Sequence, residues 1–235
     1  MLFVILQLVV LFPVILYLSS FDRAYERKNK IIRLYGIYGY FGLPGAGKTI
    51  AMCQELNNLR KRYGSDIYIT TNFYYDKQDF PFEGWRQLLV PYDKPLIVAW
   101  DEVQNEFNSR DFKNFPIALL TQLTQVRKGN GIRIYYTSQR FHFVDKNFRS
   151  LSFGINDCST VMGRYTIVKT YDLVDYEEIQ NQPAVDRKRK IRPKKIISFV
   201  QTKKERDCYD SFKMLETAKS KEYMTREEVN SVSSL

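Results

Sequence analysis

The 235-residue chain is long enough for one domain of roughly 150 to 200 residues with appended segments. Charged residues make up 26% of the chain, which excludes a bundle of many membrane spans. Its three cysteines lie far apart and form no CxxC pair, so they suggest neither a zinc site nor a disulfide framework. The formal net charge of +10, from 36 Lys and Arg against 26 Asp and Glu, favours an anionic partner such as nucleic acid, a nucleotide or acidic lipid.

The N-terminal residues 1–21 carry no charge, and between Leu2 and Leu18 only Gln7 and Pro13 interrupt a run of Leu, Val, Ile, Phe and Tyr. Because about 20 apolar residues cross a bilayer core as a helix, we expect a single-pass membrane anchor here. The basic linker at residues 22–33 then places the rest of the chain in the cytoplasm by the positive-inside rule. The alternatives are a buried hairpin and a cleaved signal peptide. The missing basic n-region and A-x-A-like cleavage site count against the signal peptide.

The middle of the chain alternates between segments with strand and helix patterns. Aromatic, β-branched or wholly apolar runs predict strands at Leu34–Phe41, Asp66–Thr71, Pro95–Trp100 and Ile132–Thr137. Apolar residues at helical spacing predict helices at Thr49–Tyr63 and Pro116–Val126. This alternation indicates an α/β fold with a mostly parallel central sheet.

The later part of the chain has a different pattern. Thr160–Tyr171 is typical of a strand or hairpin, and Ile196–Thr202 is typical of a further strand. Between them, residues 186–195 (DRKRKIRPKK) form a basic loop, which is either solvated or in contact with nucleic acid or an anionic membrane surface. Residues 213–235 are polar and are expected to form a surface helix or a tail.

The sequence Gly42-Leu-Pro-Gly-Ala-Gly-Lys-Thr49 fits the P-loop pattern G-x-x-x-x-G-K-[ST]. Its glycines allow successive N–H groups to face phosphate oxygens, and the following helix directs its N-terminal dipole to the same place. We expect Lys48 to reach the β- and γ-phosphates and the Thr49 hydroxyl to ligate Mg²⁺. The preceding strand and the following amphipathic helix disfavour the alternative, a glycine-rich turn without a ligand. The predicted nucleotide-binding residues are Gly42, Leu43, Pro44, Gly45, Ala46, Gly47, Lys48, Thr49 and Ile50.

Two carboxylates, Asp101 and Glu102, follow the apolar run LIVAW. Asp101 would hold Mg²⁺ through water, and Glu102 would act as the general base that polarises the attacking water. An ordinary transition from strand to loop is the alternative. The pair favours hydrolysis over a GTPase-type switch or a small-molecule kinase, so the expected ligands are ATP and Mg²⁺.

Gln139 follows the predicted strand Ile132–Thr137, where a polar side chain would lie beside the γ-phosphate and respond to it. The alternative is a capping or turn residue. An arginine supplied by a neighbouring subunit would couple hydrolysis to oligomerisation. Arg110, Arg133 and Arg140 are candidates, but Arg127 is preferred because it precedes the loop Lys-Gly-Asn-Gly131 at the end of an element.

In the order of these motifs the chain resembles the zonula occludens toxin-like ATPases, which include the assembly protein of filamentous phages. More distantly it resembles the FtsK/HerA group with its viral genome-packaging ATPases. The resemblance rests on YGYFGLPGAGKT, AWDEVQNEFNSR, LTQVRKGNGIRIYYTSQR with FVDKNFRSL behind it, and Tyr209-Asp210-Ser211-Phe212. It covers about residues 34–212, which we expect to be one P-loop ATPase domain. In the toxin-like proteins the spanning segment usually follows this domain, whereas here it precedes it.

The resemblance implies a RecA/FtsK-like three-layer fold and a membrane-anchored ATPase in virion morphogenesis or viral DNA packaging. It also implies a homo-oligomeric ring such as a hexamer, with the membrane and viral DNA or capsid proteins as partners. Two alternatives stay open: a cellular or plasmid DNA translocase, and a nucleotide-binding membrane scaffold that does not hydrolyse ATP.

Overall fold

The computed structural model describes residues 34–107, 115–181 and 191–210. The predicted anchor at residues 1–21, the basic linker at 22–33 and the polar segment at 213–235 lie outside the described residues, as do residues 186–190 of the basic run. Within the described ranges, no helix has the length and apolar character needed to span a bilayer. The anchor therefore stays a prediction.

The strands of the described chain range from two to eight residues. They are β1 (Gly36–Phe41), β2 (Tyr68–Thr71), β3 (Tyr74–Tyr75), β4 (Phe80–Pro81), β5 (Leu96–Trp100), β6 (Ile132–Ser138), β7 (Gly154–Val161), β8 (Tyr165–Tyr171), β9 (Lys195–Val200) and β10 (Tyr209–Asp210). The α-helices are α2 (Lys48–Tyr63), α3 (Ile117–Thr124), α4 (Lys146–Ser150), α5 (Leu173–Asn181) and α6 (Lys203–Asp207). Short 3₁₀ helices lie at Gly64–Asp66, Trp85–Leu89, Val103–Asn105 and Phe141–Phe143.

One sheet of eight strands, in the order β4-β2-β5-β6-β1-β7-β8-β9, organises the domain. In this order the first six strands, β4, β2, β5, β6, β1 and β7, run parallel to one another. The last two strands, β8 and β9, each pair antiparallel with the strand before them. In this register Phe41 of β1 pairs with Ser138 of β6, and Trp100 of β5 pairs with Tyr136. The segments that follow β1, β2, β5 and β6 therefore all leave the sheet at the same edge.

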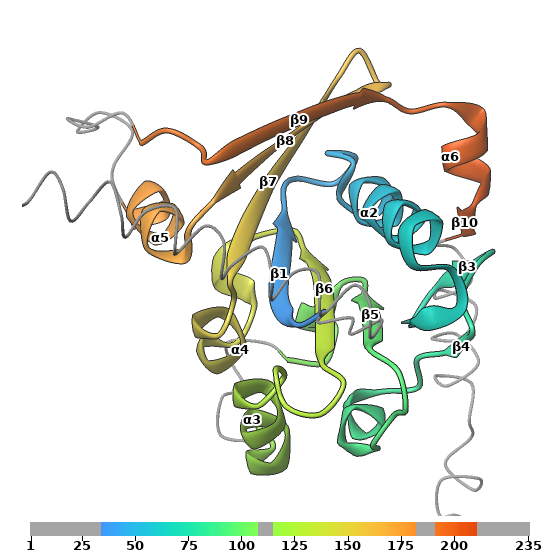
Figure 1. Ribbon diagram of the computed structural model, residues 1–235. Helices are drawn as coiled ribbons and strands as arrows, with labels where there is room; N and C mark the ends of the chain where they lie inside the picture. Colours follow the sequence, from blue (N-terminus) through green and yellow to red (C-terminus); the bar gives the residue numbers. More distant parts are fainter. Residues whose placement is uncertain (1–33, 108–114, 182–190, 211–235) are drawn as a thin grey trace, which may run out of the picture. The chain divides into compact units, whose positions relative to one another are not determined.

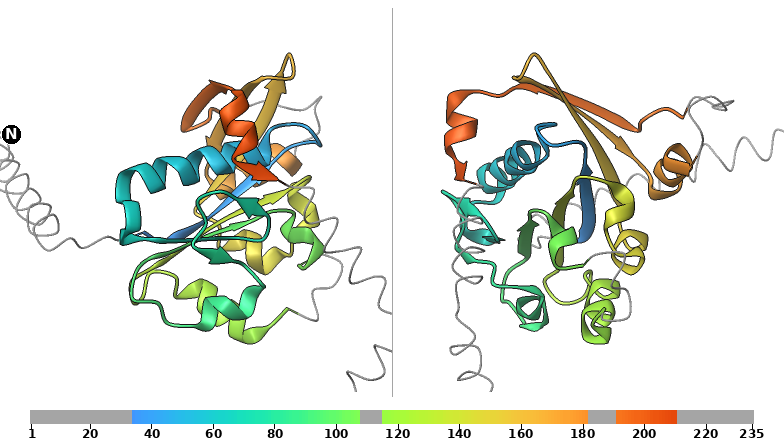
Figure 2. Two further views of the ribbon diagram at one scale, coloured as in Figure 1. Left: turned by 90° about the vertical axis from the view of Figure 1, so that its right-hand side faces the viewer. Right: turned by 180° about the vertical axis from the view of Figure 1, so that it is seen from behind.

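Helices cover both faces of the central strands. Figure 1 shows α2 on one side of β1, β6 and β5, with α3 and α4 on the other, and Figure 2 shows the same layers from two further directions. All five residues of β5 are buried, as the uninterrupted run LIVAW predicts for a strand covered on both faces. The expected α/β fold with a mostly parallel sheet is thus confirmed.

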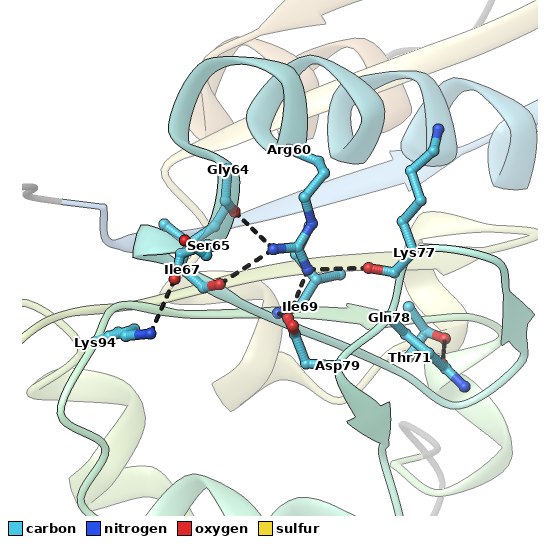
Figure 3. A network of polar contacts seen from close by, with 10 residues as sticks. All are labelled: Arg60, Gly64, Ser65, Ile67, Ile69, Thr71, Lys77, Gln78, Asp79 and Lys94. Carbon is cyan, nitrogen blue, oxygen red and sulfur yellow. Dashed lines mark hydrogen bonds and ion pairs between the residues drawn. The ribbon is translucent and has the colours of Figure 1, made fainter.

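The C-terminal end of α2 is attached to the sheet by Arg60, whose guanidinium bonds to four groups (Figure 3). It donates to the carbonyl oxygens of Gly64 at 2.7 Å, Ile67 at 3.3 Å and Lys77 at 2.9 Å. Its ion pair with Asp79 is 2.5 Å long, and Asp79 also accepts the N–H of Ile69 in β2 at 2.7 Å. One side chain thereby connects the helix, its C-terminal turn and the first strands of the sheet.

Several predicted boundaries shift in the structure. β2 starts two residues after Asp66, which instead closes a 3₁₀ helix, because Gly64 ends α2 with a turn. The segment predicted as a strand or hairpin is a hairpin, and its first strand already begins at Gly154. The basic run was expected to form a loop through Lys195, but Lys195 is the first residue of β9 and pairs with Thr170.

Candidate functional site

The P-loop connects β1 to α2 and leaves the start of the helix open. Gly47, the residue before α2, has a left-handed backbone (φ 83°) and provides no side-chain cap. The first N–H groups of α2 therefore have no side-chain acceptor from the capping position, as an anion site requires. A Cβ atom at Gly47 would lie 2.7 Å from Thr160 Oγ1 and 2.9 Å from Thr166 Oγ1. Both the backbone angle and the close approach restrict this position to glycine.

Lys48 and Thr49 are the first two residues of α2, and their side chains lie in different places. Lys48 is only 6% exposed, and its Nζ donates to the carbonyl oxygen of Leu43 at 3.2 Å, so the ammonium lies across the loop. The Thr49 hydroxyl lies 3.1 Å and 3.3 Å from the two carboxylate oxygens of Asp101. The structure therefore brings together Thr49 and Asp101, which the sequence analysis paired as metal ligands.

Asp101 follows β5 and is 5% exposed. Burial raises the pKa of its carboxyl above the ordinary value, and nearby Glu102 raises it further, while hydrogen bonds from Thr137 and Thr49 oppose the shift. A divalent cation beside this carboxylate would offset the cost of its burial. A carboxylate and a hydroxyl are also the hard oxygen ligands that Mg²⁺ prefers, so the residues present fit this ion.

Two polar residues that no sequence motif predicted hold Asp101 in place. The Asn72 side chain donates to the Asp101 carbonyl oxygen at 3.0 Å and accepts the Asp101 N–H at 2.7 Å. The hydroxyl of Thr137, fully buried in β6, donates to the Asp101 carboxylate and accepts the N–H of Glu102 at 2.9 Å. The available signal was that Asn72 comes directly after a predicted strand and that Thr137 is the last residue of the predicted strand Ile132–Thr137.

Glu102 has a left-handed backbone, with φ 53° and ψ 48°. This conformation costs a residue with a Cβ atom roughly 1 to 2 kcal/mol. Its carboxylate accepts a hydrogen bond from the amide of Gln104. The Oε1 atom of Gln104 is buried and has no hydrogen-bond partner within the described residues. A strained turn thus orients the carboxylate that was predicted as the general base.

Gln139 and Arg127 lie at opposite edges of the sheet. Gln139 is exposed just after β6, at the edge of the P-loop, and it lines a cavity of about 430 Å³ with Gly42 and Leu43. Arg127 is exposed before the start of β6, so the seven residues of that strand separate the two by roughly 20 Å. Arg127 is therefore remote from the P-loop of its own chain.

A larger cavity of about 660 Å³ adjoins the P-loop, and its size is typical of nucleotide and cofactor sites. On one side it is lined by the P-loop and the first turn of α2, with Gly45, Gly47, Lys48, Thr49 and Ile50. On the other side it is lined by Gly163, Gln201, Arg206, Tyr209 and Asp210. Pro44 is exposed and Ala46 is half-buried in the loop between them. The second wall comes from a part of the chain where no site residue was predicted from the sequence.

No protein-family model and no curated protein sequence matches the chain, whereas solved structures do. The N-terminal domain of zonular occludens toxin from Neisseria meningitidis is 19% identical, covers 75% of this chain and 100% of its own, and has a TM-score of 0.51. The DNA-packaging ATPase B204 from Sulfolobus turreted icosahedral virus is 12% identical, covers 73% and 100%, and has a TM-score of 0.46. B204 from Sulfolobus turreted icosahedral virus 2 in complex with ATP-gammaS is 10% identical, covers 71% and 98%, and has a TM-score of 0.45. The similarity to the toxin domain shows a shared fold, and the expected resemblance is confirmed at that level.

Proposed function

We propose that residues 34–212 form a P-loop domain that binds and hydrolyses ATP. The observation that carries this proposal is the contact between the Thr49 hydroxyl and the Asp101 carboxylate at 3.1 Å. It lies beside the open N-terminus of α2 and the buried Lys48, in a cavity large enough for a nucleotide. An anion nest, a cation and an acidic metal ligand meet there, which is the combination that phosphoryl chemistry needs.

Each residue has a distinct role in the proposed reaction. The N–H groups of the P-loop and the Lys48 ammonium bind the phosphates, and Thr49 and Asp101 would hold Mg²⁺, which neutralises charge on the phosphate oxygens. Glu102 accepts a proton from the attacking water, and Asn72 and Thr137 fix the backbone from which Glu102 projects. Gln139 responds to the nucleotide from the end of β6.

For the wider task, we propose that the domain is anchored in a membrane with its ATPase part in the cytoplasm. There it would drive virion morphogenesis or viral DNA packaging. The apolar residues 1–21 support the anchor, and the net charge of +10 supports an anionic partner such as DNA. Because Arg127 is remote from its own P-loop, it can reach a nucleotide only in a neighbouring copy, which requires a ring or another homo-oligomer.

Two matched substitutions in the full chain test the enzymatic proposal. We expect Glu102→Gln to lower phosphate release from Mg-ATP by about 100-fold or more while ATP still binds, because only the general base is lost. Lys48→Ala should abolish binding itself. Glu83→Gln removes an exposed carboxylate away from the site and should change neither measurement.

The same assay separates the alternatives. ATP binding without turnover by the unaltered chain would contradict the enzyme and favour the non-hydrolysing scaffold, and absence of binding would contradict the P-loop proposal as a whole. Stimulation of turnover by single- or double-stranded DNA would support packaging or a DNA translocase. A rate that DNA does not change would favour a motor for protein assembly.

A further inference from the structure

The second wall of the nucleotide cavity is a fixed segment from Gln201 to Asp210. It leaves β9, passes beside α2 as helix α6 and ends in β10, which pairs with β3 (Figure 1). A capping box of Thr202 and Glu205 starts α6, and the antiparallel pairing of Tyr209 with Tyr75 holds its far end. The side chains on this segment are therefore presented to the cavity from a defined backbone.

Arg206 of α6 is held by hydrogen bonds from one side of its guanidinium. Its Nε and Nη2 donate to Gln201 Oε1 at 3.0 Å and 2.8 Å, and Nη2 also donates to the Gly163 carbonyl oxygen at 2.7 Å. Gln201 is itself buried, and its amide donates to Thr166 Oγ1 at 2.7 Å. Thr166 is one of the two threonines packed against Gly47. A continuous set of contacts thus positions Arg206 relative to the P-loop.

The charge of Arg206 is not neutralised by this arrangement. Gln201 and Gly163 are neutral acceptors, and no acidic side chain of the described residues forms an ion pair with Arg206. Within the same residues, no acceptor bonds to its Nη1. A guanidinium that is fixed on one edge and open on the other is suited to a phosphate oxygen.

We propose that Arg206 binds a phosphate oxygen of the nucleotide held by the P-loop of its own chain, and that Gln201 is the positioning residue that aims it. Arg206 lines the same cavity as Lys48 and Thr49, whereas Arg127 lies at the opposite edge of the sheet. The cavity is thus lined by a second cation besides Lys48. This inference rests on the proposed nucleotide-binding function and adds a residue to that site.

Calorimetric titration of the full chain with Mg-ATP tests the assignment. We expect Arg206→Gln to weaken binding about tenfold or more, because a hydrogen bond to a charged group is lost. Gln201→Met keeps the volume but releases Arg206, and should weaken binding to a smaller extent. Lys204→Gln removes the same charge from a position on the same helix that does not line the cavity, and should stay within about twofold of the unaltered chain.

Salt dependence and a second variant separate a binding role from a structural one. If Arg206 contacts phosphate, affinity should fall less steeply with added salt in Arg206→Gln than in Lys204→Gln, since screening acts on the lost attraction. Arg206→Lys keeps the charge and should retain more affinity than Arg206→Gln at an equal melting temperature. The assignment would be overturned if Arg206→Gln and Lys204→Gln bound Mg-ATP with equal affinity. The proposed function would still stand if Lys48→Ala failed to bind in the same experiment. No binding by the unaltered chain would overturn both.

Discussion

The hydroxyl of Thr137 is the most informative single atom to remove, because it serves two groups at the candidate site. It donates to the Asp101 carboxylate and accepts the Glu102 N–H, and its residue is fully buried. Thr137→Val keeps the shape of the side chain and deletes only these bonds. A hydrogen bond to a charged group is worth about 1.5 to 3 kcal/mol, and a buried N–H left unpaired costs about 1 to 3 kcal/mol. Since Asp101 keeps the bond from Thr49, we expect the free energy of unfolding to fall by about 2 to 4 kcal/mol.

Thr70 in β2 provides a matched control. It is also fully buried, but its hydroxyl has no hydrogen-bond partner in the part of the chain that the structure describes. Thr70→Val therefore removes a polar atom whose burial costs desolvation free energy that no hydrogen bond offsets. The free energy of unfolding should stay the same or rise by about 1 kcal/mol. The two substitutions are chemically identical, but only Thr137→Val should lower the free energy of unfolding.

Urea unfolding of the full chain in mild detergent, followed by tryptophan fluorescence, measures both variants. The reasoning would be refuted if Thr137→Val and Thr70→Val shifted the midpoint equally. A pH series adds a second criterion. Losing the bond from Thr137 raises the pKa of the folded Asp101 carboxyl further, so the folded variant binds a proton more readily than the unaltered chain. Its stability deficit should therefore shrink as the pH is lowered.

Two further predictions concern stability away from the P-loop. Arg60→Met should lower the free energy of unfolding by about 2 to 3 kcal/mol, because Asp79 loses its ion pair and three carbonyl oxygens lose a donor. Lys61→Met, on the exposed face of the same helix, should change the free energy of unfolding little. Equal urea midpoints for the two variants would contradict this prediction. Burial raises the pKa of the Asp157 carboxyl despite the opposing charge of Lys169, so its ionised form destabilises the fold, and stability falls as the pH rises from the ordinary value through the raised one. Asp157→Asn should thus raise the melting temperature at pH 7.5 and lose this advantage near pH 4, and an equal gain at both pH values would exclude the carboxylate as the cause.

The features that the sequence predicted well are local. The P-loop and the pair Asp101-Glu102 each occupy a short stretch with a fixed pattern, and parallel strands place their carboxyl ends at one edge. The contact between Thr49 and Asp101 follows from those two facts alone. Strands such as β5 were equally clear, because burial on both faces requires an unbroken apolar run.

The features that the sequence did not predict depend on which strands become neighbours. Asn72 reaches Asp101 only because β2 lies beside β5, and Thr137 does so because β6 lies on the other side. Strands of two residues, such as β3 and β10, are too short to carry a periodic pattern. Arg206 approaches the P-loop through contacts between segments far apart in the chain, which no local pattern encodes. The side of the sheet on which Arg127 lies could have been predicted, because a residue that precedes a parallel strand lies at the amino edge.

The pairing of β10 with β3 has a consequence for the order in which the site forms during synthesis. The P-loop, β5 and β6 can assemble as soon as residues 34–138 have emerged from the ribosome. The second wall of the cavity consists of residues 201–210, whose partner strand β3 lies at residues 74–75. Contacts with such a large sequence separation form late, because a long loop must close first. A nascent chain should therefore complete its sheet before it completes the cavity beside the P-loop, and the proposed nucleotide binding would be delayed until nearly the whole domain has been made.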